Sequence, residues 1–328
     1  MSRLLRRTLY GVAAGVLLYV AAMIYFDIGP VAETLRGYRW WLFGIALLLS
    51  AGNYLLRFLK WELALGWLDV RRDAPQLTRT RSLTIYLAGL SMSVTPGKVG
   101  EVLRSLLLKA SDGIPFTRTA PVVVADRLTD LVALVILSLV GVAQFPSYLP
   151  VVVITAVLIT IAVIVLGSPR LLHGVLRFCG RIPGLRRLSA RAEPLVESTA
   201  VLLHIRVIVI LSLISVVGWG FECIGFWLII SGFGIDAPLS LCTFLWSAGT
   251  LVGALSFLPG GLGATEGSLV VAAQRLLVGV TEPIALAATL LGRLATLWFG
   301  ELVGGIALAV FLRDKTVRAR AMAEPPQE

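Results

Sequence analysis

The sequence predicts an all-α integral membrane protein with about six full transmembrane helices, two oppositely directed re-entrant helical hairpins and an internal inverted repeat. Three observations predict this fold class. Hydrophobic residues make up 57% of the 328 residues and the mean hydropathy is +0.89, so a soluble chain would have too little polar surface to cover its outside. Apolar runs of membrane-spanning length recur along the chain, and a Pro-Gly pair interrupts one apolar segment in each half.

Six apolar runs are long enough for a helix to cross a membrane, which takes about 20 residues. They cover 8–26, 40–66, 119–143, 148–168, 206–231 and 284–312. The first follows a basic start, as in a signal peptide, but it is too long for one and no small-residue cleavage site follows it. We therefore expect it to be a retained span.

The two segments that hold the Pro-Gly pairs, 82–109 and 241–279, have a different character. Pro96 and Pro259 divide them into pieces that are mostly shorter than a full crossing requires. A proline break frees backbone groups that hydrocarbon cannot satisfy, so it must lie inside protein or against a water-filled cavity. We expect two re-entrant hairpins beside a polar cavity, although two full crossings per segment would leave the rest of the topology unchanged.

The two halves of the chain are similar to each other. A shift of 166 residues places Gly52 on Gly218, Trp61 on Trp227 and Arg127 on Arg293, and the Pro-Gly pairs align at a shift of 163. We interpret residues 8–143 and 148–312 as two copies of one unit within a single domain, 1–328. In a transporter, such a repeat places two broken helices together near the membrane midplane.

The distribution of basic residues predicts the orientation. With a cytoplasmic N-terminus, 20 of the 29 Lys and Arg residues fall on the inner side and two, Arg36 and Arg39, on the outer side, as the positive-inside rule requires. The copies are then inverted, the first hairpin enters from the cytoplasm, and both termini are cytoplasmic in the cell inner membrane. The net charge of +10 fits this bias, so we do not expect nucleic-acid binding.

The polar segments are few. Residues 169–200 are predicted to form an amphipathic cytoplasmic connector on the inner leaflet, which we interpret as a link between the halves, with headgroup sensing as the alternative. Residues 313–328 are predicted to be a cytoplasmic tail. Cys179, Cys223 and Cys242 form no CxxC pair, so no metal and no cofactor are expected.

Fourteen charged residues fall in the predicted membrane region, where an unpaired charge costs about 2.5–3.5 kcal/mol. The cations are Arg57, Lys60, Lys98, Arg104, Arg127, Arg275 and Arg293, and the carboxylates are Glu62, Glu101, Asp126, Asp130, Glu222, Glu266 and Glu301. Because these groups must be paired or hydrated, they cannot face lipid. The number of charges favours a substrate path over simple locking of helices.

Phosphate suits the cationic side chains and the backbone amides of the two breaks. The candidate substrate-binding residues are Arg57, Lys98, Gly97, Gly100, Arg104, Arg127, Arg293, Gly260, Gly261 and Gly263. The candidate coupling or charge-pair residues are Glu101, Asp126, Asp130, Glu222, Glu266 and Glu301. Two alternatives stay open: Arg127 and Arg293 could pair with carboxylates to lock the hairpins, and Glu101 and Glu266 could carry protons or, as we favour, cap the helices that follow the breaks.

Three motifs in this order, TPGKVGEVLRSLLL, DRLTDL and FLPGGLGATEGSL, resemble the flippase-like family, the transmembrane domain of lysylphosphatidylglycerol synthases, over about 8–312. The resemblance implies movement of a lipid across the bilayer, and some stand-alone members are tied to polyprenyl-linked glycosylation or hopanoid pathways. It points to motif positions Pro96, Gly97, Gly100, Glu101, Asp126, Arg127, Pro259, Gly260, Gly261, Gly263 and Glu266. About 16 residues follow the last span, too few for the soluble aminoacyltransferase of a complete synthase, so the lipid need not be aminoacylated.

We therefore expect a translocator of an anionic lipid, such as a phospholipid or a polyprenyl-phosphate-linked lipid. Without a GxxxxGK[ST] motif, transport would be passive, ion-coupled or driven by consumption of the lipid. One alternative is a membrane-embedded lipid-phosphate transferase or hydrolase with Mg²⁺ at Asp126 and Asp130. Another is a non-transporting partner of a lipid-modifying synthase or glycosyltransferase.

Overall fold

The computed structural model describes residues 28–95, 101–142, 149–179 and 193–313. Every regular element within these ranges is a helix, which confirms the all-α prediction. The first predicted span (8–26), the first-break residues Pro96, Gly97, Lys98 and Gly100, and nearly all of the predicted tail lie outside the described residues.

The long helices form where the apolar runs predict them. The described helices of this kind are α3 (Trp40–Trp67), α7 (Phe116–Val142), α8 (Leu149–Gly167), α12 (Ile205–Gly232) and the continuous run of α15 (Glu282–Arg293), a π-helical segment η5 (Leu294–Trp298) and α16 (Phe299–Arg313). Among the described residues, Trp40–Trp67, Ile205–Gly232 and Glu282–Arg313 are long and apolar enough to cross a membrane. The total number of spans stays a prediction.

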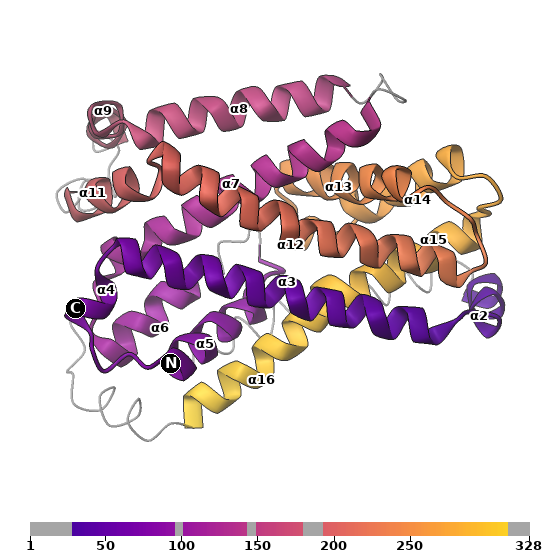
Figure 1. The fold of residues 1–328 in the computed structure, drawn as a ribbon, viewed down its shortest axis with the longest axis horizontal. Coiled ribbons are helices and arrows are strands. Elements are labelled where there is room, and N and C mark those ends of the chain that lie inside the picture. The colour runs from indigo at the N-terminus through magenta and orange to yellow at the C-terminus, as the bar shows by residue number, and fades with distance from the viewer. Residues whose placement is uncertain (1–27, 96–100, 143–148, 180–192, 314–328) are drawn as a thin grey trace.

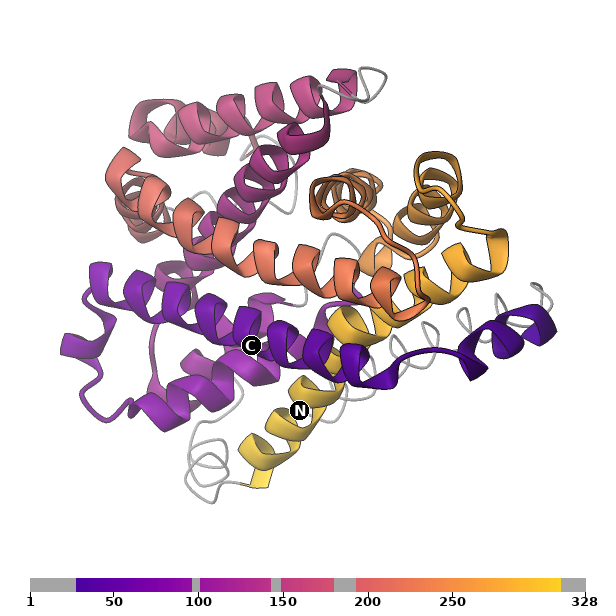
Figure 2. The same cartoon turned by 45° about the vertical axis from the view of Figure 1, so that its right-hand side comes forward.

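The two break segments are each divided into short helices. The first contains α5 (Arg79–Ala88), η1 (Gly89–Met92) and α6 (Leu103–Asp112), and the second contains α13 (Leu239–Leu255), η4 (Pro259–Gly261) and α14 (Ala264–Leu276). Figure 2 shows α13 and α14, in orange, grouped beside α15. The helices of the second segment are interrupted at its Pro-Gly pair, as predicted, whereas the first pair lies outside the described residues. A re-entrant path through a membrane stays a prediction.

Helices α3 and α12 form an antiparallel pair at the centre of the molecule (Figure 1). The Arg39 N–H, just before α3, donates to the Gly232 carbonyl at the end of α12 over 3.1 Å. Glycines permit the close approach, because a Cβ at Gly52 would lie 3.1 Å from the Phe221 ring and a Cβ at Gly218 would lie 2.5 Å from Asn53 Oδ1. An inverted repeat requires its equivalent helices to run in opposite directions, as these two do.

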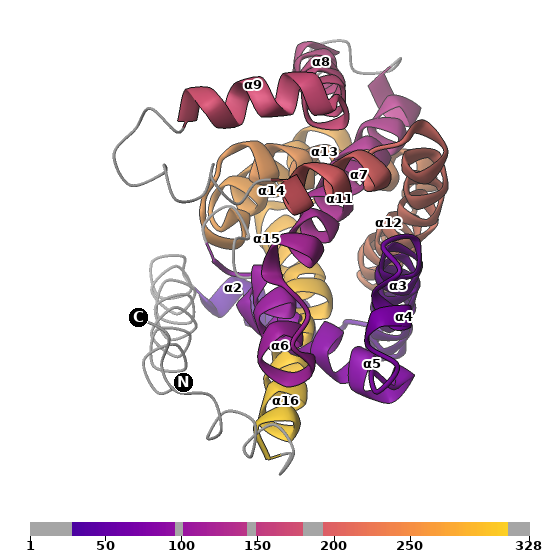
Figure 3. The ribbon, with the colours of Figure 1, turned by 90° about the vertical axis from the view of Figure 1, so that its left-hand side faces the viewer.

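Each break segment packs against a long helix of the other half of the sequence. Helix α16 lies against α5 and η1, as Figure 3 shows for the lower end of the molecule, and α7 lies against α13. The two halves therefore interlock around the breaks and form one body.

The remaining described helices are short. They are α2 (Ile28–Arg36), α4 (Val70–Asp73), α9 (Pro169–Cys179) and α11 (Glu193–Leu202). Helix α11 packs against α7 and α8, with Val196 and Leu202 buried. The last part of the predicted connector is thus a packed helix of the body, because its apolar side chains meet α7.

Gly304 is the point of closest approach between α16 and the first break segment. A Cβ there would lie 2.2 Å from the backbone nitrogen of Ser91, which cannot move aside as a flexible side chain could. Gly304→Ala is therefore expected to lower the free energy of unfolding by about 1–3 kcal/mol, as overpacking does, measured by thermal unfolding in detergent. Gly305→Ala is the matched control, since nothing lies within 4 Å of a Cβ there, and it should not destabilise the protein. Equal effects of the two substitutions would refute the close contact.

Candidate functional site

A cavity of about 320 Å³ lies between the two halves. Its walls come from α3, α7, α12 and α13, from the second break at η4, and from the run α15–η5–α16. The charged residues that line it are Arg57, Glu101, Arg127, Asp130, Glu222 and Arg293. The cavity therefore brings charged residues from both halves together beside the second break.

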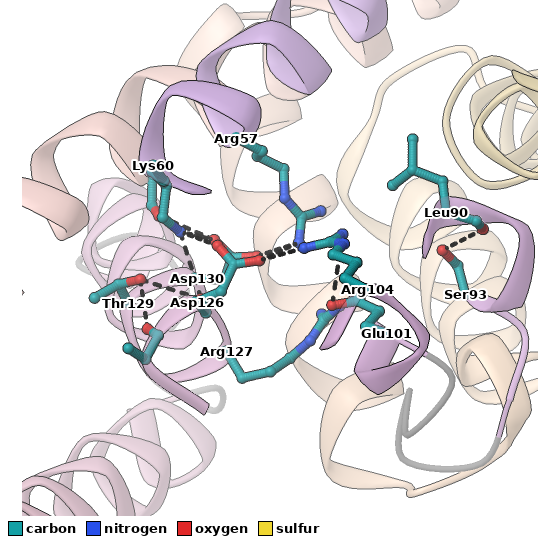
Figure 4. A network of polar contacts seen from close by, with 12 residues as sticks. Arg57, Lys60, Leu90, Ser93, Glu101, Arg104, Asp126, Arg127, Thr129 and Asp130 are labelled. Atoms are coloured by element: carbon teal, nitrogen blue, oxygen red, sulfur yellow. Dashed lines mark hydrogen bonds and ion pairs between the residues drawn. The ribbon is translucent and has the colours of Figure 1, made fainter. Parts of the chain in front are cut away.

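A buried charge network joins α3 to α7 beside this cavity (Figure 4). The Arg57 Nη2 atom lies 3.2 Å from Asp126 Oδ2 and 3.0 Å from Asp130 Oδ2. The Lys60 Nζ atom lies 2.6 Å from Asp126 Oδ1 and 2.9 Å from Asp130 Oδ1. Ser215 of α12 completes the arrangement, accepting from Lys60 Nζ over 2.6 Å and donating to Asp130 Oδ1 over 2.9 Å. Each aspartate thus faces two cations, which leaves little room for a metal ion on the pair.

Arg104 of α6 also contacts this charge network. Its guanidinium carbon lies 4.3 Å from the centre of the Tyr86 ring, and its Nη1 atom lies 3.6 Å from Asp126 Oδ2. Gly89 makes room for it, because a Cβ there would lie 2.4 Å from Arg104 Cγ. Arg104 is only 1% exposed and does not line the cavity. Its position supports a role in holding Asp126 and does not support the predicted direct contact with substrate.

The two repeat-related arginines make equivalent ion pairs. Arg127 of α7 pairs with Glu101, two residues before α6, and Arg293 pairs through Nε with Glu266 Oε1 of α14 over 2.7 Å. Each pair ties the helix after a break to the long helix that follows it. The geometry therefore matches the alternative in which both arginines pair with carboxylates and hold the helices together. Both arginines also line the cavity.

Three glycines determine the backbone path at the second break, and Glu266 caps the helix that follows it. Gly260, Gly261 and Gly263 have φ angles of 60°, 68° and 82°, in the left-handed region that favours glycine. Glu266 Oε2 accepts the Gly263 N–H over 2.8 Å, which caps α14, and Arg293 Nη2 donates to the Gly260 carbonyl over 2.6 Å. Gly260 and Gly261 line the cavity, whereas Gly263 and Glu266 lie outside its walls. The capping alternative for Glu266 thus matches the geometry.

Aromatic packing replaces the charge network in the second half. The positions equivalent to Asp126 and Asp130 are Gly292 and Thr296, and a Cβ at Gly292 would lie 2.7 Å from the Trp246 ring. Trp246 stacks on Phe226 with 5.1 Å between ring centres. The charges of the two halves therefore differ because, in the second half, the Trp246 ring occupies the space that a carboxylate would need at position 292.

The other predicted carboxylates have separate roles. Glu222 lines the cavity and accepts from Asn53 Nδ2 over 2.6 Å and from Trp246 Nε1 over 3.3 Å. Glu301 of α16 lies outside the cavity walls, and its Oε1 atom accepts the Val94 N–H over 2.9 Å. Glu301 thereby fixes the backbone just before the first break.

Comparisons with known proteins identify the family of this chain. A family model described as the lysylphosphatidylglycerol synthase TM region matches residues 11–304. The chain belongs to this family. It is also similar to two UPF0104 membrane proteins of Methanothermobacter thermautotrophicus: one is 23% identical over 90% of this chain and 91% of the relative, and the other is 25% identical over 88% of each.

Membership in the lysylphosphatidylglycerol synthase transmembrane family confirms the resemblance stated from the three motifs. It also establishes the chain as a membrane protein. Of the motif positions in the described residues, Glu101, Arg127, Gly260 and Gly261 line the cavity, while Asp126 lies behind it in the charge network.

Sequence reasoning missed several residues of this family member's site. Lys60 was counted among the membrane charges but not placed in the site, although it lies three positions after Arg57 and thus on the same helix face. Tyr54 lines the cavity and donates to the Thr296 carbonyl, inside the π-helical segment, over 2.5 Å. Ser215 carries no signal in the sequence, because a serine in an apolar helix usually bonds its own backbone.

Several buried donors on residues that line the cavity have no hydrogen-bond partner among the residues that the structure describes. The Nε atoms of Arg57 and Arg127 are buried and make no hydrogen bond to any described residue. Buried donors are normally satisfied by protein, water or a ligand. These two atoms, on side chains that line the cavity, therefore indicate a polar occupant.

Proposed function

We propose that this membrane protein moves an anionic lipid between the two leaflets, with the phosphate-bearing headgroup in the cavity between its halves. The observation that carries the proposal is the pair of unsatisfied Nε donors of Arg57 and Arg127. A phosphate oxygen is a strong acceptor for such donors, and arginine suits phosphate better than lysine does.

The charges beside the cavity are divided unevenly. The first-half network contains four cations, Arg57, Lys60, Arg104 and Arg127, and three carboxylates, Glu101, Asp126 and Asp130. This network alone therefore has one positive charge in excess, which Glu222 of the second half offsets in the cavity lining. A phosphate would have to bind next to the arginines of the first half and away from Glu222.

The size of the cavity fits a headgroup and not a whole lipid. Its volume of about 320 Å³ is near the lower end of the range for small-molecule sites, about 300–1,000 Å³. In the proposal, the headgroup occupies the cavity and the hydrocarbon chains stay in lipid, so no charged group crosses bare hydrocarbon. The protein would lie in the inner membrane with both termini cytoplasmic, and the breaks would be re-entrant hairpins that alternate in access.

The rival interpretation as a metal-dependent lipid-phosphate enzyme loses support from the site. Asp126 and Asp130, its proposed metal ligands, each face Arg57 and Lys60. Among the residues that the structure describes, no group of three or more His, Cys, Asp or Glu side chains could hold a metal ion. No specific feature favours the interpretation as a non-transporting partner of a synthase or glycosyltransferase.

Leaflet exchange in vesicles tests the proposal. The purified protein is placed in vesicles with fluorescent phosphatidylglycerol or, as a zwitterionic control without net charge, fluorescent phosphatidylcholine, and exchange is followed by quenching of the outer leaflet. We expect phosphatidylglycerol to exchange at least about tenfold faster than phosphatidylcholine, the factor that 1.4 kcal/mol of selective binding supplies. A polyprenyl phosphate probe extends the test to the second lipid class. Equal rates for the anionic and zwitterionic probes, or no exchange of any probe by folded protein, would refute the proposal.

A further inference from the structure

The cavity has one exposed edge. Among its described lining residues, those that are exposed are Ala254, Phe257 and Leu258. Ala254 lies in the last turn of α13, and Phe257 and Leu258 lie between α13 and the second break, where they are 75% and 46% exposed. The other described lining residues are buried or partly buried. The cavity therefore opens to the outside at 254–258.

The backbone at this edge is strained. Phe257 has a φ angle of 54°, in the left-handed region that bulky residues rarely adopt. Ser256 maintains the turn, since its hydroxyl donates to the Gly253 carbonyl over 2.7 Å and accepts the Leu258 N–H over 3.2 Å. Such strain persists only where the surrounding structure imposes it, and it is concentrated at functional sites. Here it holds a large aromatic side chain outward at the cavity edge.

We propose that residues 254–258 form a lateral portal, where the hydrocarbon chains of a bound anionic lipid leave the cavity and pass over Phe257 and Leu258. This inference rests on the proposed function and adds a binding site for the apolar part of the same lipid. The occupant is a hydrocarbon chain because the exposed side chains are apolar and the protein lies in a membrane. A cavity sized for a headgroup needs an apolar exit, and this is the exposed edge that its described walls offer.

The portal lies next to a cation that can hold the headgroup. Arg293 Nη2 donates to the carbonyl of Gly260, two residues after Leu258, and Arg293 lines the same cavity. Leu131 and Leu297 add apolar surface to the lining. A lipid with its phosphate at Arg293 would therefore place its chains at Leu258 and Phe257.

Photo-crosslinking at the portal tests this placement. Phe257 is replaced by p-benzoylphenylalanine, which inserts into nearby C–H bonds, in vesicles that mix phosphatidylglycerol with phosphatidylcholine. The control position is Leu213 of α12, which is 62% exposed and does not line the cavity. We expect the ratio of phosphatidylglycerol to phosphatidylcholine adducts, measured by mass spectrometry, to be about tenfold higher at position 257 than at 213.

Two further variants connect the enrichment to the site. The double variant Arg293→Gln, Glu266→Gln is expected to return the adduct ratio at position 257 to that at 213, because the headgroup loses its charged partner while no carboxylate is left without its own. Ser256→Ala is expected to reduce the enrichment, because the turn that holds position 257 outward loses both hydroxyl bonds. The same adduct ratio at 257 and 213 in the otherwise unchanged protein, or no lipid adduct at 257, would overturn the portal.

The outcome is separable from that of the leaflet-exchange test. Enrichment at 257 without lipid exchange would support the portal and refute transport, since the protein would bind the lipid without moving it. Selective exchange without enrichment would support transport and overturn the portal.

Discussion

Neutralising both members of the Arg127–Glu101 ion pair is expected to lower phosphatidylglycerol exchange at least about tenfold while the protein stays folded. Removing one partner of a buried ion pair is strongly destabilising, because the other charge stays buried without its partner. The double variant Arg127→Gln, Glu101→Gln avoids this loss, because both charges are removed together. The cavity still loses the cation whose Nε donor has no protein partner, and a charge-assisted contact with phosphate goes with it. Leaflet exchange in vesicles measures the loss, and thermal unfolding reports the fold.

The charge count of the network separates two explanations of this result. After the double substitution, Arg57, Lys60 and Arg104 still face Asp126 and Asp130, so the excess of one positive charge is unchanged. A loss of exchange would therefore come from the missing arginine contact and not from a change in overall charge.

A second ion pair gives the matched control. Arg118 and Asp73 also form an ion pair, but neither residue lines the cavity, and their side chains are 27% and 57% exposed. Exposed pairs contribute little to stability, so Arg118→Gln, Asp73→Asn should leave exchange within about twofold to threefold of the original rate. Unchanged exchange in the Arg127–Glu101 variant, or an equal loss in both, would show that Arg127 has no specific role in binding.

The long helices were predictable because their signal is local. The apolar runs 40–66 and 206–231 predict helices that the structure places at Trp40–Trp67 and Ile205–Gly232. Hydropathy depends only on neighbours in the sequence, and the three family motifs are likewise contiguous. The helix class and the family were therefore predicted and confirmed, while the number of spans and the orientation stay predictions.

The partners of the charges were not predictable because they depend on packing. The sequence indicated only that Arg127 and Arg293 could pair with carboxylates, and the packing of the helices assigns Glu101 and Glu266 as their partners. The sequence likewise assigns no partner to Arg104. In the fold, its side chain passes Gly89 and reaches Asp126. The sequence therefore identified which charges need a partner, and the fold determined which partner each one has.

Lys60 is the residue whose loss is expected to destabilise the protein most. It is fully buried, and its ammonium group contacts Asp126, Asp130 and Ser215 within 3 Å. Lys60→Met keeps an unbranched apolar stem but leaves Asp130 with Arg57 alone and Asp126 with Arg57 and, at 3.6 Å, Arg104. The free energy of unfolding should fall by about 3–5 kcal/mol, as when one partner of a buried ion pair is removed, measured by denaturant unfolding in mixed micelles.

A compensating substitution tests whether the carboxylates cause that loss. Asp130→Asn, added to Lys60→Met, removes one buried negative charge, and its single side-chain oxygen can still accept from either Ser215 or Arg57. Asp126 then keeps Arg57 as its partner at 3.2 Å. If unpaired charge is the cause, the double variant should be more stable than Lys60→Met alone, with a coupling energy of about 1–3 kcal/mol. Additive losses would instead mean that the Lys60 stem matters for its packing, and the charge network would then contribute specificity for the lipid rather than stability for the fold.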